Sequence, residues 1–204
     1  RGKFHFAYPR KLRIDEINRK FTSIKNRMFL PRFLREMKKL KIGIDIDNVI
    51  ADSYPHYIDA FNKKFGTAVK YEEVFHFYYL EKNVGVEEAL VVEFIESIVH
   101  SEEFQLQIPP VINALKIIKK WIKLGFSIHY ITSRPSDTKS ETMKWLKQQR
   151  FWVRGVTLDL YHETEHNFKH ISRINNYKSD VADKKKLDVF IEDRLFATLD
   201  TTVR

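Results

Sequence analysis

The sequence predicts an α/β fold, a Rossmann-like doubly wound parallel sheet, and three observations favour it. Short runs rich in Ile, Val, Leu and aromatic residues alternate with helical patterns from residue 40 to residue 192. Two carboxylates, Asp45 and Asp47, follow the first run. A second acidic pair, Glu192 and Asp193, follows the last run. Because ligands of such sheets bind at the carboxyl ends of the strands, these pairs predict a site there.

The composition is that of one globular domain without disulfides. The chain has 204 residues, 43% of them hydrophobic and 31% charged, which are ordinary values for a globular protein. The absence of cysteine excludes thiolate metal sites and a cysteine nucleophile. No apolar run approaches the roughly 20 residues of a membrane span, and no signal peptide is evident. A cytoplasmic protein is therefore expected.

The positive charge lies almost entirely in the N-terminal segment. Residues 1–36 contain 11 Lys and Arg against 3 Asp and Glu, so they hold +8 of the net +9. A basic N-terminal extension is expected here, followed by a core domain over 37–204. A solvated or loosely packed extension is favoured over a nucleic-acid contact and over an organellar transit segment. Because the sequence does not begin with Met, a fragment is also considered.

Four strands are expected where β-branched and aromatic residues are dense. The runs are short, as buried parallel strands are. They are Leu40–Ile46, Ser127–Thr132, Val156–Tyr161 and Val189–Glu192.

Helices are expected between the strands, where apolar residues recur three or four positions apart. Gly66 and Gly125 suit the position just after a helix, and Pro135 suits a first turn. The helical segments are Tyr54–Phe65, Glu72–Tyr79, Glu87–Ser97, Val99–Gln105, Val111–Leu124, Ser133–Gln149 and Lys178–Lys186, and 162–176 is left unassigned.

The pair Asp45 and Asp47 is the first candidate site. Side chains two positions apart in a strand share a face, so two like charges are held together. That arrangement is costly unless a cation or a proton lies between them. Three interpretations are open: a buried strand with an acidic turn, a magnesium site without catalysis, and phosphoryl transfer in which one aspartate attacks phosphorus and the other handles protons.

Partners for phosphoryl transfer follow at other strand and helix ends. Thr132 and Ser133 end the second strand, where a hydroxyl can donate to a phosphate oxygen, although the pair also suits a helix N-cap. Lys178 opens the last helix, where its ammonium would neutralise developing charge. Glu192 and Asp193 add carboxylates that suit Mg²⁺.

This set resembles the haloacid dehalogenase-like phosphohydrolases. Their motifs are Asp-x-Asp after a hydrophobic stretch, Thr or Ser after another, a Lys, and an acidic pair after a strand. The resemblance covers roughly residues 40–196. The segment from Asp45 to Asp52 is most similar to the 5′(3′)-deoxyribonucleotidases and their bacterial relatives, as are Thr132-Ser133 and residues 190–194.

The resemblance implies a catalytic role for four residues. Asp45 would be the nucleophile that forms an aspartyl-phosphate. Asp47 would protonate the leaving oxygen and then activate water. Thr132 would orient the phosphoryl group, and Lys178 would pair with Asp45 and the phosphate.

The resemblance also implies a Mg²⁺ site and contacts to substrate. Asp45, Asp47 (through its backbone carbonyl) and Asp193 would bind Mg²⁺, with Glu192 as a further ligand or as a partner of one. Ser133 would lie close to the phosphate. Arg134 would either contact phosphate or cap the following helix.

A small helical cap, inserted over 52–108 after the first strand, is a further implication. Its aromatic residues suit the core of the cap better than a wall for a nucleobase; they are Phe75, Phe77, Tyr78 and Tyr79. A histidine series at helical spacing suits a solvated face better than a metal site; it comprises His162, His166 and His170.

Two departures from the family pattern stand out. Asn48 replaces the usual Gly after the second aspartate, and Asn is the next most tolerant residue for positive φ. The sequence ends at Arg204, soon after Asp193, where the family usually continues, so a truncated C-terminal end is expected.

The sequence thus predicts a Mg²⁺-dependent phosphohydrolase that acts on a small phosphorylated substrate such as a (deoxy)nucleotide. The alternative is a catalytically weak domain that acts as a binding or regulatory module through residues 1–36. A narrower alternative is removal of phosphate from the end of a nucleic acid, which would join the basic segment to the site.

Overall fold

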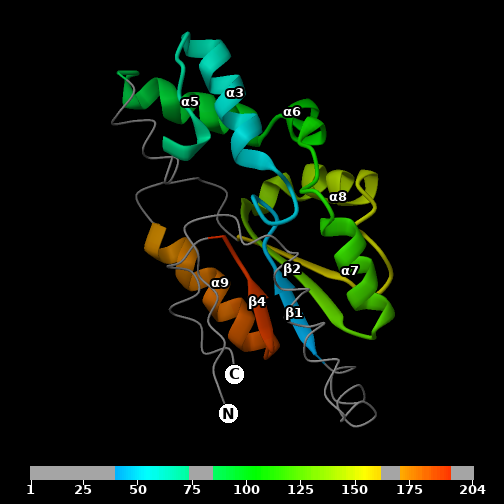
Figure 1. Ribbon diagram of the computed structural model, residues 1–204. Coiled ribbons are helices and arrows are strands. Elements are labelled where there is room, and N and C mark those ends of the chain that lie inside the picture. The colour runs from blue at the N-terminus through cyan, green and yellow to red at the C-terminus, as the bar shows by residue number, and fades with distance from the viewer. Residues whose placement is uncertain (1–39, 74–84, 162–170, 194–204) are drawn as a thin grey trace.

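A parallel four-stranded sheet forms the centre of the molecule (Figure 1). The computed structural model describes residues 40–73, 85–161 and 171–193. The strand order is β3-β2-β1-β4, and the three pairings between these strands are parallel. This confirms the predicted α/β fold. The strands are β1 (Lys41–Ile44), β2 (Ser127–Pro135), β3 (Thr157–Tyr161) and β4 (Val189–Ile191).

The order of the strands places a topological switch point beside β1. The chain runs from β1 outward to β2 and β3, and then returns to place β4 on the other side of β1. Ile44 is in register with Tyr130 of β2 and with Ile191 of β4, so the carboxyl ends of these strands meet at one edge. A switch point of this kind is where doubly wound sheets bind ligands.

Helices connect the strands and mostly follow the predicted segments. Gly66, at φ 66°, ends the first helix in the left-handed conformation, as predicted. The helices are α3 (Ser53–Phe65), α5 (Glu88–Val99), α6 (Glu102–Gln107), α7 (Ala114–Lys123), α8 (Lys139–Gln148) and α9 (Ile171–Lys185), with 3-10 turns η1 (Tyr71–Glu73) and η2 (Ser136–Thr138).

Each face of the sheet has its own apolar core. Trp121 of α7 and Trp145 of α8 belong to the larger core, which lies on the face of the sheet that carries the Ile42 and Ile128 side chains. Ala182 of α9 and Leu187 form the smaller core with Ile131 of β2. The alternation of strand side chains between two covered faces explains why the strands read as nearly continuous apolar runs.

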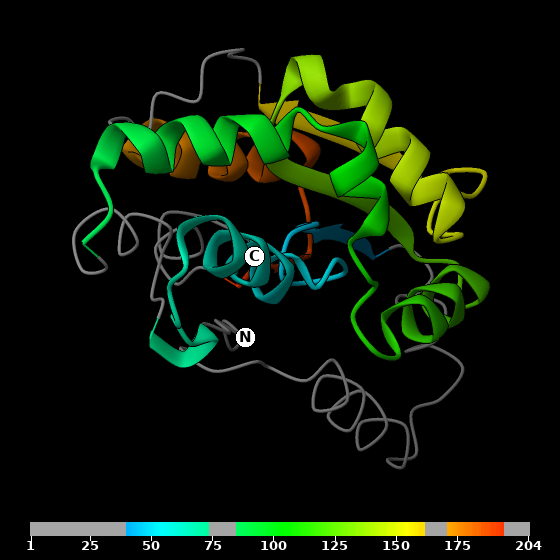
Figure 2. The same ribbon diagram turned by 90° about the horizontal axis from the view of Figure 1, so that it is seen from above.

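A group of helices lies beyond the carboxyl end of the sheet. Figures 1 and 2 show α3, α5 and α6 at this end, after β1 in the chain. Lys144 on α8 pairs with Glu102 at 2.6 Å, and the Trp145 indole donates to the Ile108 carbonyl at 2.9 Å. These contacts fix α6 to the core of the fold. The predicted helix over 72–79 begins as η1, and its remainder, with the four aromatic residues, lies outside the described residues.

Two predicted helix boundaries are wrong. Residues 133–135 continue β2 with a bulge against β3, so α8 begins at Lys139 and Thr132 and Ser133 do not cap it. Helix α9 runs from Ile171 to Lys185, which places Lys178 in its middle rather than at its start. The polar sequence of α9 has only a weak apolar pattern, and this hid its first two turns. Of the histidine series, all three members lie outside the described residues.

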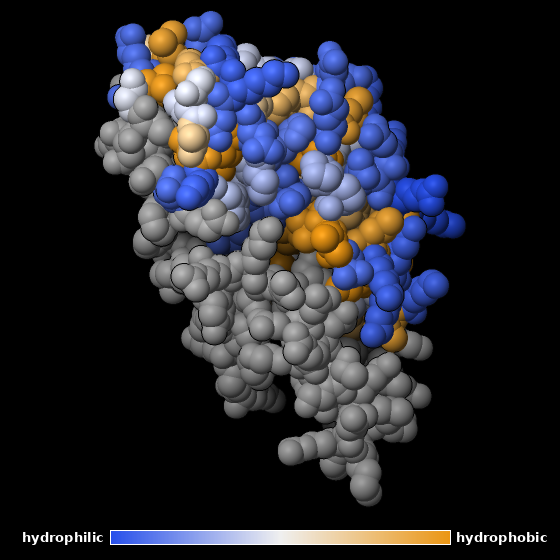
Figure 3. All heavy atoms as spheres, turned by 45° about the horizontal axis from the view of Figure 1, so that its top comes forward, coloured by the Kyte–Doolittle hydropathy of each residue, from blue (hydrophilic) through white to orange (hydrophobic). Residues whose placement is uncertain are grey.

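On the face that Figure 3 shows, hydrophilic side chains cover most of the described part of the surface, with smaller hydrophobic patches between them. Among the described residues, the large hydrophobic side chains that are exposed are Leu90 and Ile112. No helix in the described ranges has the length and apolar content that crossing a membrane requires.

Candidate active site

Asp45, directly after β1, lies at the centre of a buried charge cluster. Its side chain is 4% exposed, and its backbone N–H donates to the Ile191 carbonyl of β4 at 2.9 Å. The Lys178 ammonium donates to Asp45 Oδ2 at 2.8 Å and to Glu192 Oε2 at 2.6 Å. Among the described residues, no group donates a hydrogen bond to Asp45 Oδ1. One oxygen of Asp45 is thus held by a lysine, and the other is buried and available.

The carboxylates around Asp45 fit a divalent cation. One oxygen each from Asp45, Glu192 and Asp193 lie within 4.8 Å of one another. Lys178 pairs with two of these carboxylates, those of Asp45 and Glu192, and it is the one cation that the described ion pairs place on this group, so negative charge is in excess there. Hard cations such as Mg²⁺ take oxygen ligands of this kind, and the free Oδ1 supplies one. The Asp47 carboxylate is not a member of this group.

Asn48 connects the loop after β1 to the end of β4. Its backbone has φ 58°, as expected for the residue that replaces Gly, and its N–H donates to the Ala51 carbonyl at 2.7 Å. The side-chain amide donates to Asp193 Oδ2 at 2.9 Å and accepts from the Tyr54 N–H at 3.0 Å. One residue thus sets the turn and orients an acidic side chain of the cluster.

Asp47 lies in a second set of contacts, in which its carboxylate is fully engaged. Arg134 Nε donates to Oδ2 at 2.9 Å, and Arg134 Nη2 donates to Oδ1 at 2.8 Å. The Ser53 hydroxyl, in the first turn of α3, donates to Oδ1 at 2.6 Å. Arg134 was expected to contact phosphate or cap a helix; its side chain pairs with Asp47, and it does not begin a helix because β2 extends past Thr132.

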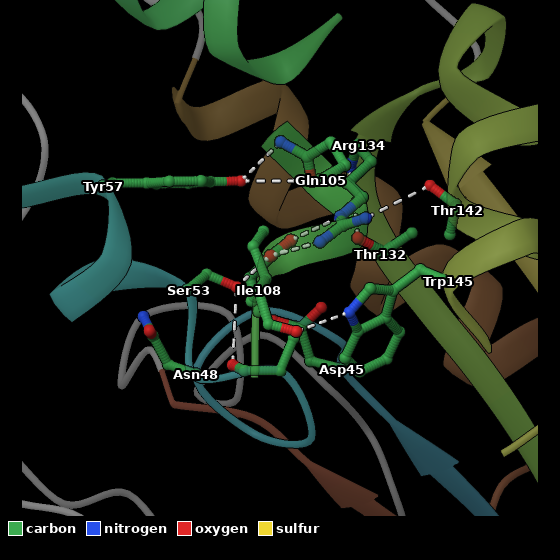
Figure 4. Close-up of polar contacts among 12 residues, drawn as sticks. Asp45, Asn48, Ser53, Tyr57, Gln105, Ile108, Thr132, Arg134, Thr142 and Trp145 are labelled. Atoms are coloured by element: carbon green, nitrogen blue, oxygen red, sulfur yellow. Dashed lines mark hydrogen bonds and ion pairs between the residues drawn. The ribbon is translucent and has the colours of Figure 1, made fainter. Parts of the chain in front are cut away.

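The hydroxyl residues of β2 lie at the same edge of the sheet. Thr132 is completely buried, and its Oγ1 accepts the Arg134 backbone N–H at 3.2 Å. Figure 4 shows Thr132 between the Arg134 side chain and Asp45. Ser133 is half-buried and, among the described residues, belongs to neither set of contacts. The structure thus places Thr132 in the site, whereas Ser133 is adjacent to it in the chain without joining either set of contacts among the described residues.

A polar pair from the helical layer lies above the Asp47 and Arg134 contacts. The Tyr57 hydroxyl of α3 accepts from Gln105 Nε2 of α6 at 3.1 Å, and Gln105 also donates to the Ile98 carbonyl at 2.8 Å. Both side chains are buried, and Figure 4 shows them beside Arg134. Burial and the nearby Asp47 charge raise the pKa of Tyr57, so its hydroxyl stays neutral at physiological pH.

The two aspartates have opposite electrostatic environments. Burial raises the pKa of Asp45 despite the Lys178 ammonium. Burial and the Asp45 charge raise the pKa of Glu192 well above its ordinary value. Burial alone would raise the pKa of Asp47, but the Arg134 guanidinium and the Ser53 hydroxyl outweigh it, so that pKa is lowered. Without a cation, Asp47 is therefore the more acidic of the two carboxyls, and a cation bound beside Asp45 would favour ionisation of Asp45.

The sequence interpretation missed three polar residues of the site. Ser53 was given no role, because the predicted helix begins at Tyr54, and Tyr57 and Gln105 were expected only as helical positions. Ser53 and Tyr57 lie four positions apart at the start of the helix that follows Asp-x-Asp, so they share one face of it, and this spacing was the available signal. Nothing local marks Gln105, because its partner is 48 residues away.

Sequence comparison finds two likenesses. Over 119 residues the chain is 29% identical to a protein of Bacillus cereus (strain ATCC 14579) named "Putative nucleotidase", a match that covers 56% of this chain and 61% of that protein. The chain therefore spans less than two thirds of this relative. A family model described as "PITM 1-3, LNS2 domain" matches residues 92–188, slightly under half of the chain. That range contains Lys178 but neither Asp45 nor Asp47.

Comparison with solved structures supports the fold. A hydrolase from Streptococcus pneumoniae TIGR4 has a TM-score of 0.51 at 10% identity, covering 78% of this chain and 86% of that one. A class C acid phosphatase from Bacillus anthracis with tungstate bound is more distant, with a TM-score of 0.46 at 16% identity, covering 90% and 60%. The resemblance to the haloacid dehalogenase-like phosphohydrolases and their nucleotidase branch is confirmed, and the chain has the haloacid dehalogenase-like α/β fold.

Proposed function

We propose that this protein is a Mg²⁺-dependent phosphohydrolase that cleaves small phosphomonoesters through a phosphorylated Asp45. The observation that carries the proposal is the state of the Asp45 carboxylate. Lys178 holds Oδ2 at 2.8 Å, while Oδ1 is buried and receives no hydrogen bond from a described residue. An oriented carboxylate with one unengaged oxygen, at the switch point of a doubly wound sheet, suits nucleophilic attack.

The cation would be held by the chain's own carboxylates. Asp45 and Asp193 are the proposed ligands, with Glu192 as a further ligand and the Asp47 backbone carbonyl completing the protein's share. When bound, the ion neutralises charge on the phosphate and draws its oxygens into the site. The excess negative charge of the cluster is what favours a cation there.

The reaction has two steps at phosphorus. In the first, an oxygen of Asp45 forms a bond to phosphorus while the bond to the ester oxygen breaks, and the leaving oxygen takes a proton from Asp47. In the second, water attacks the aspartyl-phosphate, Asp47 takes a proton from that water, and the bond to Asp45 breaks. Lys178 offsets the negative charge, and the Thr132 hydroxyl donates to a phosphoryl oxygen.

Asp45→Asn tests this function, because the amide oxygen is a poor nucleophile. Phosphate release from a panel of nucleotides and sugar phosphates, with and without Mg²⁺, is expected to require both the metal and Asp45. Asp188→Asn, an exposed aspartate one residue before β4, is the matched control. Wild-type turnover by Asp45→Asn would disprove the proposed mechanism.

A nucleotide is the substrate class we propose. The supporting observations are the likeness of residues 45–52 to the deoxyribonucleotidases and the name of the Bacillus cereus relative. Mononucleotides should therefore be cleaved faster than sugar phosphates of similar size. Inclusion of 3′- and 5′-phosphorylated oligonucleotides in the panel separates a nucleotidase from an enzyme that acts on nucleic-acid ends.

A binding or regulatory module remains the second candidate. It is favoured by the family match over 92–188, which omits both aspartates of the first motif. Residues 1–36, its proposed contact surface, lie outside the described residues. Deletion of residues 1–36 should abolish salt-dependent binding to nucleic acid if this candidate is right, and should leave phosphate release unchanged if the chain is an enzyme alone.

A further inference from the structure

The Asp47 carboxylate is held at both of its oxygens by groups that are themselves buried. Arg134 contributes two parallel N–H···O bonds, at 2.9 and 2.8 Å, in the fork geometry that a guanidinium makes with a carboxylate. Ser53 adds the third bond, at 2.6 Å. The side chains of Arg134 and Asp47 are 7% and 22% exposed. A pair this well enclosed has one orientation, unlike an ion pair on the surface.

Arg134 is in turn fixed by its surroundings. Its backbone N–H donates to Thr132 Oγ1 at 3.2 Å, and Nη1 donates to the completely buried Thr142 Oγ1 of α8 at 3.4 Å. Figure 4 shows the guanidinium between Thr142 on one side and Ser53, at the start of α3, on the other. The arginine thus connects β2 and α8 to Asp47.

We infer that Arg134 is a positioning residue, which holds the Asp47 carboxylate at the place where the leaving oxygen exchanges its proton. The inference rests on the proposed function, in which Asp47 handles that proton. Arginine is suited to the task because its rigid fork fixes both position and rotation of a carboxylate, whereas lysine fixes neither. Misplacement of a proton donor by about 1 Å can reduce the rate about 100-fold.

The alternative is that Arg134 binds substrate phosphate. The two roles differ in which kinetic quantity they control. A phosphate ligand contributes to binding of every phosphoester, so its loss raises KM for all of them. In the first step, a residue that positions Asp47 matters only when the leaving oxygen needs a proton, so its loss slows this step only for esters of weakly acidic alcohols. The second step is the same for every ester, and the first turnover is therefore the quantity to compare.

The test uses two substrates, p-nitrophenyl phosphate and a simple alkyl phosphate such as glycerol phosphate. Nitrophenolate leaves without a proton, whereas an alkoxide requires one. For Arg134→Lys we expect the first-turnover cleavage of the alkyl phosphate to slow about 100-fold, with little change in KM and little change in the first-turnover release of nitrophenol. In the first turnover, Asp47→Asn should show the same selectivity. The double variant should lose no more than Asp47→Asn alone, because both changes remove one function.

Three controls make the result decisive. Arg154→Gln, at an exposed position before β3, controls for loss of an arginine and should leave the cleavage rates of both substrates unchanged. Ser53→Ala removes only the third bond to Asp47, so it should slow cleavage of the alkyl phosphate by a smaller factor and again leave nitrophenol release unchanged. This variant keeps the test available if Arg134 variants do not fold. For Arg134→Ala, added guanidinium should restore cleavage of the alkyl phosphate selectively.

Two outcomes would overturn the inference. One is an equal rise in KM for both substrates in Arg134→Lys and Ser53→Ala, which would assign Arg134 to phosphate binding. The other is additive losses in the double variant, which would separate Arg134 from Asp47. Cleavage that survives Asp45→Asn would instead overturn the proposed function, and this inference with it.

Discussion

The ammonium of Lys178 lies 2.8 Å from Oδ2 of Asp45, although 133 residues separate them in the chain. Both side chains are almost fully buried, at 2% and 4% exposure. A buried charge is tolerated only when an opposite charge or a hydrogen bond compensates it. Lys178 compensates two carboxylates at once, since it also contacts Glu192 at 2.6 Å. The lysine is therefore a structural member of the site as well as a candidate for its chemistry.

Lys178→Met should reduce both stability and activity. Removal of one partner from a buried ion pair costs about 3–5 kcal/mol because it leaves the other charge uncompensated. Here two carboxylates, on Asp45 and Glu192, lose their ammonium. We expect a loss of this size in the free energy of unfolding, measured by urea denaturation, together with loss of phosphate release.

Lys185→Met is the control from the same helix. Lys185 pairs with Asp159 at 3.0 Å, but both side chains are about one quarter exposed. Solvent screening limits such a pair to about 1 kcal/mol or less. Equal destabilisation by the two substitutions would contradict the role assigned to Lys178.

The local sequence was sufficient to predict the strands and the residues at their carboxyl ends. Strands β1 and β3 lie within one or two residues of the expected segments, because buried parallel strands have a dense apolar pattern. Asn48 adopts the positive φ that its place in the motif required. The carboxylates of Asp45, Glu192 and Asp193 were expected together because parallel strands end at one edge.

The contacts that the sequence did not reveal are those between side chains far apart in the chain. The pairing of Arg134 with Asp47 spans 87 residues, and it depends on β2 extending three residues beyond Thr132. Pro135 suggested an earlier helix, since proline is frequent in a first turn, but it also fits the bulge between β2 and β3. Local patterns cannot decide whether Pro135 begins a helix or continues a strand, because the answer depends on pairing with β3, which is distant in the sequence.

The stability of the metal-free protein should fall as pH rises above the ordinary carboxyl range. The pKa of Glu192 is raised well above 4.5, and that of Asp45 is also raised, chiefly by burial. Between the ordinary and the raised pKa values, the folded chain holds more protons than the unfolded chain. The free energy of unfolding therefore decreases with rising pH until the raised pKa values are passed. Thermal denaturation in EDTA from pH 4.5 upward measures this slope.

Two comparisons test the cause of that slope. Glu192→Gln should flatten the dependence of stability on pH, because it removes the carboxyl whose pKa is raised well above its ordinary value. Saturating Mg²⁺ should also flatten it, because a cation favours the ionised carboxylates. An unchanged slope in both experiments would place the titrating group elsewhere.

Replacement of Asn48 should separate its two contributions, the turn and the contact with Asp193. Asn48→Gly retains a residue that tolerates φ 58° but removes the amide that donates to Asp193 Oδ2 at 2.9 Å. Loss of a partner that orients a metal ligand commonly weakens metal binding about 10-fold or more. We expect Asn48→Gly to weaken Mg²⁺ binding by that amount in a calorimetric titration, with little loss of stability. Asn48→Ala should in addition destabilise the fold by about 1 kcal/mol because of the positive φ.

Asn113→Gly is the matched control for this substitution. Asn113 also has positive φ, at 68°, but it lies exposed before α7. Mg²⁺ binding by Asn113→Gly should equal that of the unaltered protein. Equal weakening by both glycine variants would show that the Asp193 contact does not orient the metal ligand.

Asp47→Asn should separate the two steps of the proposed reaction. An asparagine neither donates a proton as an acid nor accepts one from water, so both steps that involve Asp47 are slowed. With p-nitrophenyl phosphate the first step needs no proton donor, whereas the second step still needs a proton acceptor. The variant should therefore release one equivalent of nitrophenol per protein rapidly and then stop, while phosphate stays on Asp45.

Rapid-quench measurement of nitrophenol against phosphate tests this, with Asp180→Asn on the exposed face of α9 as control. Equal release of both products from the first turnover would show that Asp47 is not needed to activate water, and the carboxylate that Arg134 and Ser53 hold so firmly would then require a different role.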